Sequence, residues 1–349
     1  MKKLNFKGSL SNWLTYAGVI VAFVVLQLLA TTGGISSTLK GQLVPVCAYV
    51  VMALSLNLTV GVLGELSLGH AGFMSVGAFT GAVTAAALQT AIPNTGLRLF
   101  IAMLMGALLA AIAGVIIGVP VLRLRGDYLA IVTLAFGEII KSIVTNLYIG
   151  VDAKGLHISF LTNTLKMDGG KMIMNGPMGV PANTKISTFL AGFILIMITL
   201  VVIFNLVKSR SGRAIMALRD NRIAAESVGI NVTKYKLMAF VISASLAGAA
   251  GTLFGLSQNT IVATKFDFNT SILVLVFVVL GGLGRMWGSI IAAAALTILP
   301  EMLREFSEYR MLIYAIVLIL VMLATNNPTM KNFFGKIFGK LSRKGADEE

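Results

Sequence analysis

Few ionisable side chains lie within or at the edges of the long apolar stretches of this chain. Glu138 and Lys141 lie three residues apart in one such stretch, and near the edges of others lie Glu65, Asp127 and Asp267. A charge inside a membrane is costly, so it faces a protein interior or a partner by default. On one helix, Glu138 and Lys141 are spaced to pair. For Glu138 three alternatives stay open: a structural ion pair, a side chain that reaches the membrane surface, and a direct role in transport.

Motifs for hydrolytic, metal or nucleotide chemistry are missing from the sequence. The two histidines, His70 and His157, form no HExxH pattern, so a zinc protease site is unsupported. The single cysteine, Cys47, can form neither an intrachain disulfide nor a cysteine metal site. Neither a GxxxxGK(S/T) phosphate loop nor a nucleophile motif is found. We therefore expect no catalytic residue, no metal, no bound cofactor and no ATPase in this chain. His70 is either a polar packing group or a group that lines a path.

Glycine is frequent, with 36 residues, and much of it recurs at helical spacing. Four pairs have the small-xxx-small spacing that lets helix backbones approach closely in lipid: Gly77 and Gly81, Gly114 and Gly118, Gly251 and Gly255, and Gly284 and Gly288. The clusters at residues 64–72 and 281–288 are typical of elbows, where an unwound backbone exposes polar groups to a pathway. The pathway candidates are Gly64, Glu65, Gly69, His70, Glu138, Gly281, Gly282 and Gly284. Helix packing is the alternative for these glycines.

The elements that must hold these residues are membrane-spanning helices. The chain of 349 residues is 57% hydrophobic and 12% charged, which leaves too few charges to cover a soluble protein. Several runs approach the ~20 apolar residues that a helix needs to cross a bilayer. We predict an all-α, polytopic membrane protein with one transmembrane domain over residues 1–349. Its ten predicted segments are residues 13–32, 43–62, 67–90, 99–122, 128–149, 186–207, 237–258, 270–281, 288–300 and 311–325. The eighth and ninth are short, which indicates broken or re-entrant helices.

Ten crossings place both termini on one side of the membrane. Basic residues gather on that side, before the first segment, near residue 124, in residues 208–236 and in the tail at 326–349. By the positive-inside bias this side is the cytoplasm, and the loop at 150–185 is extracytoplasmic. The first segment is interpreted as a retained helix rather than a signal peptide. The same bias explains the net charge of +14, so no nucleic-acid partner is expected.

Two stretches suggest an internal repeat. "VGVLGELSLGHAGFMSVGAFTGA" lies in the first half and "VVLGGLGRMWGSIIAAAAL" in the second, and each joins a glycine-rich elbow to a small-residue helix. Two units of five crossings would have opposite orientations, which is the inverted-repeat arrangement of many transporters. The similarity is short, so an inverted repeat of five plus five and a chance likeness both stay open.

The segment at 208–236 carries seven basic residues between two apolar segments. At 100° per residue, one helix face holds Ala214, Leu218, Asn221, Ala225 and Val228, and a break is expected near residues 220–221. A helix that lies on lipid carries larger apolar groups, whereas small residues suit insertion into a protein groove. Gly229 supplies a stop signal. The alternative is a cytoplasmic loop that is helical and has only a topological role.

Four stretches of the chain resemble a known family: "ALSLNLTVGVLGELSLGHAGFMSVGAFTGA", "LRLRGDYLAIVTLAFGEII", "SGRAIMALRDNRIAAESVGINVTKYKLMAFVISASLAGAAGTLFG" and "VLGGLGRMWGSIIAAAALTILPE". They are similar to the permease subunits of bacterial ATP-binding-cassette importers for branched-chain amino acids, the LivM type. The resemblance covers residues from about 40 to 325. It is less specific for the substrate, because permeases for urea or short amides look much alike.

The resemblance implies a division of labour in the bacterial inner membrane. An extracytoplasmic binding protein would deliver leucine, isoleucine or valine, and a second permease of the LivH type would complete the pathway. Two cytoplasmic ATPase subunits would use the ATP. The family's "AAExxGI"-like coupling loop, which seats in the ATPase, maps onto Ala224, Ala225, Glu226, Gly229 and Ile230. With the preceding helix, the implied ATPase-coupling residues are Arg213, Ala214, Leu218, Asn221, Ala224, Ala225, Glu226 and Gly229.

Two rival functions differ in what they require. An ion-coupled secondary transporter needs a charge within the membrane, for which Glu138 is the best candidate. An intramembrane enzyme needs a nucleophile or metal motif, and the sequence offers neither.

Overall fold

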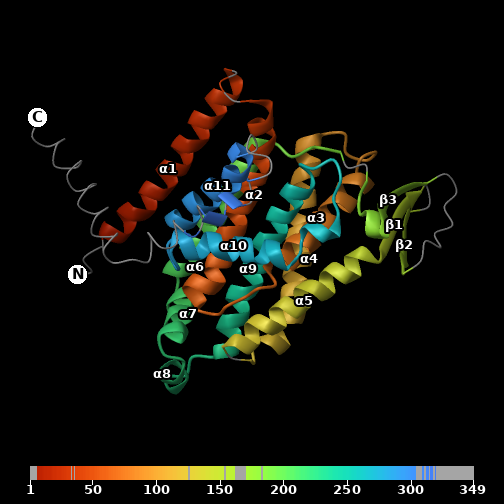
Figure 1. The fold of residues 1–349 in the computed structure, drawn as a ribbon. Helices are drawn as coiled ribbons and strands as arrows, with labels where there is room; N and C mark the ends of the chain where they lie inside the picture. Colours follow the sequence, from red (N-terminus) through yellow and green to blue (C-terminus); the bar gives the residue numbers. More distant parts are fainter. Residues whose placement is uncertain are drawn as a thin grey trace, which may run out of the picture. The chain divides into compact units, whose positions relative to one another are not determined.

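The computed structural model describes residues 6–32, 34, 36–124, 126–152, 155–161, 170–181 and 184–303, together with 309, 312, 313, 315, 316 and 319. The first part consists of α1 (Phe6–Thr31), α2 (Ser37–Asn57), the π-helical η1 (Leu58–Leu63), α3 (His70–Ala87), α4 (Thr95–Val121) and α5 (Asp127–Thr145) (Figure 1). The second part consists of α6 (Phe189–Lys208), α7 (Arg210–Asp220), α8 (Arg222–Ser227), α9 (Val232–Gly255), α10 (Phe268–Gly281) and α11 (Met286–Met302). Residues 1–294 form one compact unit and residues 295–349 a second.

Within the described residues, six helical segments are long and apolar enough to cross a membrane: Ser37–Leu63, Thr95–Val121, Tyr128–Thr145, Phe189–Lys208, Val232–Gly255 and Ala263–Gly281. The apolar helices Thr15–Thr31 and Met286–Met302 are shorter. The chain is therefore a polytopic, mainly helical membrane protein. The count of ten crossings and the inverted repeat stay predictions. The tenth predicted segment, 311–325, falls largely outside the described residues, and the basic tail at 326–349 falls wholly outside them.

The prediction of an all-α fold is wrong for part of the expected extracytoplasmic loop. Residues 147–175 hold a three-stranded antiparallel sheet in the order β2-β1-β3, formed by β1 (Leu147–Asp152), β2 (Gly155–Phe160) and β3 (Lys171–Asn175). The first two strands combine β-branched and aromatic residues with glycine, whereas β3 has a single β-branched residue, and all three are five or six residues long. Strands this short carry a weak signal beside the long apolar helices.

Side-chain caps mark where several spanning helices begin. Asn94 Oδ1 accepts hydrogen bonds from Gly96 N and Leu97 N at the start of α4, at 3.0 and 3.3 Å. Thr188 Oγ1 accepts one from Ala191 N at the start of α6, and Asp267 Oδ1 accepts one from Thr270 N at the start of α10. Such oxygens satisfy N–H groups that have no partner within the helix. The helix boundaries are therefore fixed by the local sequence.

Helix α9 is the centre of the larger unit, where it contacts α2, α3 and α4 (Figure 1). Glycine makes these contacts close: a Cβ on Gly77 would collide with the backbone of Gly248, and one on Gly251 would collide with the backbone of Met74. Thr252 Oγ1 donates a hydrogen bond to Gly77 O at 2.8 Å across the same interface. The packing role predicted for Gly77 and Gly251 is thus confirmed.

Candidate coupling segment and glycine elbows

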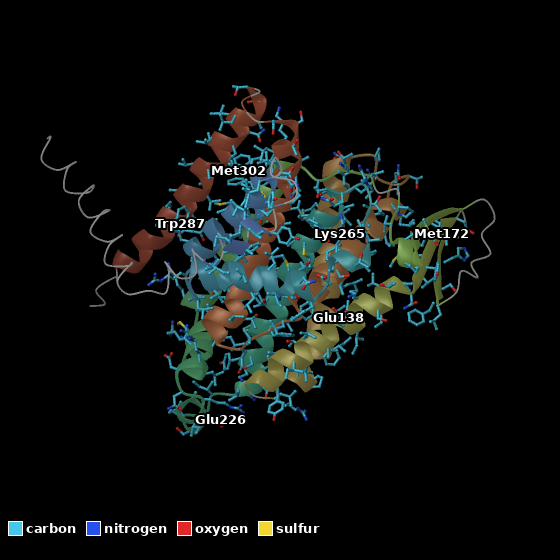
Figure 2. All side chains as sticks on the ribbon, in the orientation of Figure 1. Glu138, Met172, Glu226, Lys265, Trp287 and Met302 are labelled. Carbon is cyan, nitrogen blue, oxygen red and sulfur yellow. The ribbon has the colours of Figure 1, made fainter. Side chains whose placement is uncertain are left out.

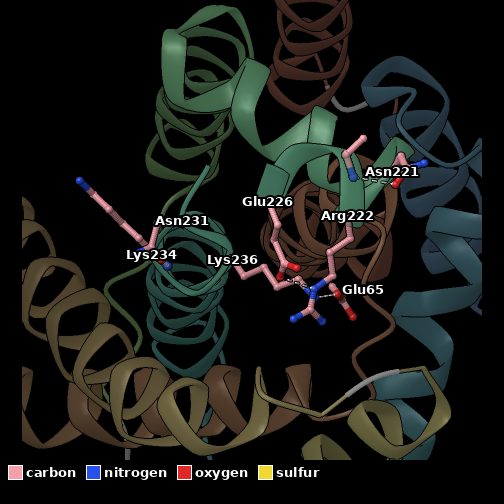
Figure 3. Close-up of polar contacts among 8 residues, drawn as sticks. Glu65, Asn221, Arg222, Glu226, Asn231, Lys234 and Lys236 are labelled. Atoms are coloured by element: carbon pink, nitrogen blue, oxygen red, sulfur yellow. Dashed lines mark hydrogen bonds and ion pairs between the residues drawn. The ribbon is translucent and has the colours of Figure 1, made fainter. Parts of the chain in front are cut away.

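The basic segment at 208–236 folds into α7, α8 and the start of α9, and capping residues separate the three pieces. Ser209 Oγ accepts a hydrogen bond from Gly212 N at 3.1 Å, and Asn221 Oδ1 accepts one from Ala224 N at 3.1 Å. Asn231 Oδ1 accepts one from Lys234 N at 3.0 Å (Figure 3). Asn221 itself has extended backbone angles, φ −154° and ψ 103°. The predicted break near residues 220–221 is confirmed.

The small-residue face of this segment is turned toward the rest of the chain. Ala214, Leu218 and Ala225 are buried. Leu218 and Ala225 pack with Val232 at the start of α9. The prediction of one continuous face is wrong for Val228, whose surface is 76% exposed, and for Asn221, which is also exposed. The extended backbone at Asn221 reorients α8, so helical spacing counted across the break no longer applies.

The outward side of α8 carries different residues. Ile223 is 80% exposed, and with Val228 it forms an exposed apolar pair, although large aliphatic side chains normally seek burial. Beside them, Arg222 Nε donates to Glu226 Oε1 at 3.0 Å (Figure 3). Glu226 lies at the tip of the segment (Figure 2). We call Ile223, Ala224, Val228, Arg222 and Glu226 the α8 surface. The sequence analysis did not single out Ile223, and it placed Val228 on the small-residue face.

The two remaining predicted coupling residues have local roles. Arg213 Nη1 donates a hydrogen bond to Lys208 O at 3.1 Å, within its own segment. Gly229 has φ 84°, and nothing lies within 4 Å of where its Cβ would be. Glycine is therefore needed there for the left-handed turn and not for lack of space.

The two glycine elbows, far apart in sequence, meet in the structure. Asn57 Oδ1 accepts a hydrogen bond from Gly284 N at 2.8 Å, and Asn57 Nδ2 donates one to Ser289 Oγ at 2.9 Å. A Cβ on Gly61 would collide with both Asn57 and Gly284. Gly64, which ends η1, has φ 80°, while Gly282 and Gly284 have φ 93° and 77°. Three of the predicted elbow glycines thus occupy left-handed turns that glycine adopts without strain.

Neighbouring helices hold the first elbow from two sides. Glu65 forms an ion pair with Lys236 of α9, and both side chains are largely buried (Figure 3). Arg219 of α7 donates a hydrogen bond from Nη1 to Gly61 O at 2.5 Å. A buried charge needs a partner, and Lys236 gives Glu65 one. Lys236 and Arg219 were not singled out by the sequence analysis, because their partners are far away in the chain.

His70 and Gly69 are placed inside the chain. The His70 ring is 1% exposed, and its Nε2 lies 2.8 Å from Ser55 Oγ. A Cβ on Gly69 would collide with the carbonyl of Thr133 on α5. The N–H of Ala71 donates to Ser271 Oγ at 3.1 Å and so joins α3 to α10. These contacts favour the packing alternative for both residues.

The predicted pair of Glu138 and Lys141 forms, with Lys141 Nζ 2.7 Å from Glu138 Oε2. The Glu138 side chain is 41% exposed and that of Lys141 26%, on a helix that the chain leaves largely uncovered (Figure 2). Gly281 instead touches the backbone of Gly288 and Ser289, where a Cβ would collide. Glu138 is thus on the surface of this chain, whereas Gly281 is a packing residue.

A cavity of about 320 Å³ opens between α3, α4, the end of α5 and the sheet. Its lining is mostly aliphatic and aromatic, and includes Val76, Phe79, Leu109, Ile149 and Met174. The polar lining side chains are Thr80 and Thr84. The cavity can accept an aliphatic group, but its lining offers no charge for an ammonium or carboxylate group.

Comparisons with known proteins identify the family of the chain. Residues 38–322 match the profile of the family described as "Branched-chain amino acid transport system / permease component". The chain is 38% identical over 288 residues to the high-affinity branched-chain amino acid transport permease LivM of Salmonella typhimurium, and 37% identical over 286 residues to LivM of Escherichia coli. Each match covers 79% of this chain and 66% of the relative, slightly under two thirds of its length. A ribose import permease, RbsC of Escherichia coli, is 27% identical over 79% of this chain and 81% of its own length. No solved structure matches.

Proposed function

Because this chain belongs to the family of permease components of branched-chain amino acid transport systems, we propose that it carries leucine, isoleucine and valine across the bacterial inner membrane. The observation that carries the proposal is the family match over residues 38–322. The higher identity to LivM, 38% against 27% for the ribose permease, favours amino acids over sugars. Urea and short amides are the alternative substrates within the same kind of permease.

The energy for import comes from partner subunits in this proposal. The sequence has no phosphate-binding loop, so two cytoplasmic ATPase subunits use ATP while this chain forms a pathway with a second permease of the LivH type. An extracytoplasmic binding protein delivers the substrate. The sheet formed by β1, β2 and β3 is then the surface that contacts this binding protein. The α7–α8 segment and both termini lie on the opposite side, in the cytoplasm.

The α8 surface is the docking element for an ATPase. Exposed Ile223 and Val228 are anchors for a hydrophobic groove, while Ala224 lets the helix approach closely. The buried coupling residues Ala214, Leu218 and Ala225 lie on the opposite side of this segment, where they pack against the rest of the chain. Asn221 and Gly229 mark its two ends.

The pathway runs along α5 and past the elbows. Lipid does not tolerate an exposed ion pair within a spanning helix, so Glu138 and Lys141 face water or the second permease. A substrate with an ammonium and a carboxylate group suits a surface that carries both signs of charge. The elbow glycines Gly64, Gly282 and Gly284 let the pathway change shape at its cytoplasmic end.

The decisive experiment is purification of the chain in mild detergent with identification of its partners by mass spectrometry. We expect a second permease and two ATPase subunits, together with a binding protein when substrate is present. Proteoliposomes of this complex should take up leucine with ATP, and isoleucine and valine should compete. Uptake by the chain alone under a proton or sodium gradient would instead establish a secondary transporter. Competition by urea but not by valine would establish the alternative substrate.

A further inference from the structure

We propose that Arg219 is a positioning residue that transmits movement of the α7–α8 segment to η1 and to the glycine elbow that follows it. The inference rests on the proposed function and adds the residue through which the cytoplasmic segment acts. Its basis is the hydrogen bond of 2.5 Å from Arg219 Nη1 to the carbonyl of Gly61, 158 residues earlier in the chain. A guanidinium group is always charged and holds its donors in a rigid plane, so it can direct one of them at a chosen acceptor.

The acceptor lies where a helix needs an outside partner. η1 ends at Leu63, and the N–H groups of Gly64 and Glu65 both return to Thr59 O. The carbonyl of Gly61 therefore belongs to the last turn, where carbonyl groups have no partner within the helix. π-helical turns of this kind are rare and occur often at functional sites. Arg219 thus binds the elbow at a point where its own hydrogen bonding is incomplete.

Gly61 is closely packed against the second elbow, and Gly64 against Arg219. A Cβ on Gly61 would collide with Asn57 and Gly284, and a Cβ on Gly64 would lie 2.9 Å from Arg219 Cγ. Asn57 in turn is bonded to Gly284 and Ser289 of the second elbow. Close-packed groups transmit displacement instead of absorbing it. A shift of Arg219 therefore moves both elbows together.

A second cation holds the same elbow from the other end of the exposed segment. Lys236 on α9 is paired with Glu65, and α8 lies between Arg219 and Lys236 in the chain. One basic residue that contacts this region therefore precedes α8 in the chain and the other follows it, and α8 is the helix that we assign to ATPase docking. Figure 3 shows the side chain of Lys236 directed toward Glu65. Displacement of α8 is transmitted to the elbow through the hydrogen bond of Arg219 and the ion pair of Lys236.

The test replaces Arg219 in the full complex and measures substrate taken up per ATP hydrolysed. In Arg219→Gln we expect an assembled complex with ATP hydrolysis close to wild type and leucine uptake reduced on the order of tenfold, the size of a typical coupling effect. Arg219→Lys keeps a charged donor and should recover part of the uptake. Arg210→Gln is the matched control: it removes the same charge from the same helix at an exposed position that is not among the coupling residues.

Three outcomes would contradict the proposal. Arg219→Gln could keep the wild-type ratio of uptake to hydrolysis, Arg210→Gln could lose as much of that ratio, or Arg219→Gln could fail to assemble, which would make Arg219 a docking or folding residue. Failure of the proposed function is recognised separately, because the wild-type complex would then take up no branched-chain amino acid.

Discussion

The side-chain carbonyl of Asn57 accepts a hydrogen bond from the backbone N–H of Gly284, 227 residues further along the chain, at 2.8 Å. This bond joins the end of α2 to the turn between α10 and α11. Asn57 is fully buried, and its amide also donates to Ser289. One side chain therefore satisfies polar groups from the second elbow inside the protein.

Replacing Asn57 by alanine should destabilise the protein. The change removes two hydrogen bonds and leaves their partners unsatisfied, which costs about 1–3 kcal/mol in the free energy of unfolding. Thermal unfolding in detergent measures this loss. Asn205→Ala on α6 is the control, because Asn205 is exposed and should change the unfolding temperature little. Equal shifts for the two variants would contradict the role assigned to Asn57.

Alanine substitutions at a packed glycine and at an unpacked glycine should have opposite effects on stability. Gly77→Ala places a methyl group against the backbone of Gly248, and overpacking of this kind costs about 1–3 kcal/mol. Gly41→Ala on α2 has no atom within 4 Å of the new methyl group and should stabilise the helix by about 0.5–1 kcal/mol. Thermal unfolding of both variants provides the comparison. A neutral Gly77→Ala would show that the helices separate at no cost.

The α8 surface predicts loss of a partner without loss of the fold. Ile223→Asp and Val228→Asp put charges on exposed positions, so the unfolding temperature should stay within a few degrees of wild type. ATPase retained during purification should fall on the order of tenfold or more, as for an interface anchor.

Ala225→Leu provides the contrast on the buried side of α8. It enlarges a side chain that is 3% exposed, so it should lower the unfolding temperature as well as ATPase retention. If Ile223→Asp retained the ATPase in full, α8 would not be the docking element.

The ion pair on α5 predicts a defect confined to uptake. Glu138→Gln leaves Lys141 without its partner at a surface that we assign to the pathway. Leucine uptake should fall on the order of tenfold because the remaining charge is no longer balanced, while complex assembly and ATP hydrolysis persist. Glu138→Asp, which keeps a negative charge beside Lys141, is the control and should retain part of the uptake. Unchanged uptake in Glu138→Gln would identify the pair as structural.

Local features of this fold could be predicted from the sequence. The break at Asn221 follows from a capping side chain, the pair of Glu138 and Lys141 follows from their spacing, and the helix positions follow from apolar length. The direction of the small-residue face could not be predicted, because the rotation introduced at Asn221 depends on packing against Val232. The sheet was missed because its strands are short beside the helices.

Contacts between residues that are distant in the chain could not be predicted from the sequence. Nothing in the sequence near residue 57 indicates that Asn57 bonds Gly284, and nothing near residue 219 points to Gly61. The glycine clusters signalled two unusual places, whereas their meeting depends on the tertiary fold. Their proposed role in a pathway stays a prediction, as do the coupling residues.

The π-helical winding of η1 has a consequence for chain length. These six residues make wider turns than an α-helix, so they use about one residue more for the same rise. One residue corresponds to a rotation of about 100°. The wider turns absorb that rotation, so deleting one of the six would restore ordinary winding and leave Gly64 facing Arg219 in nearly the same direction. The additional residue therefore widens the helix at this point, and the direction of the elbow does not depend on it.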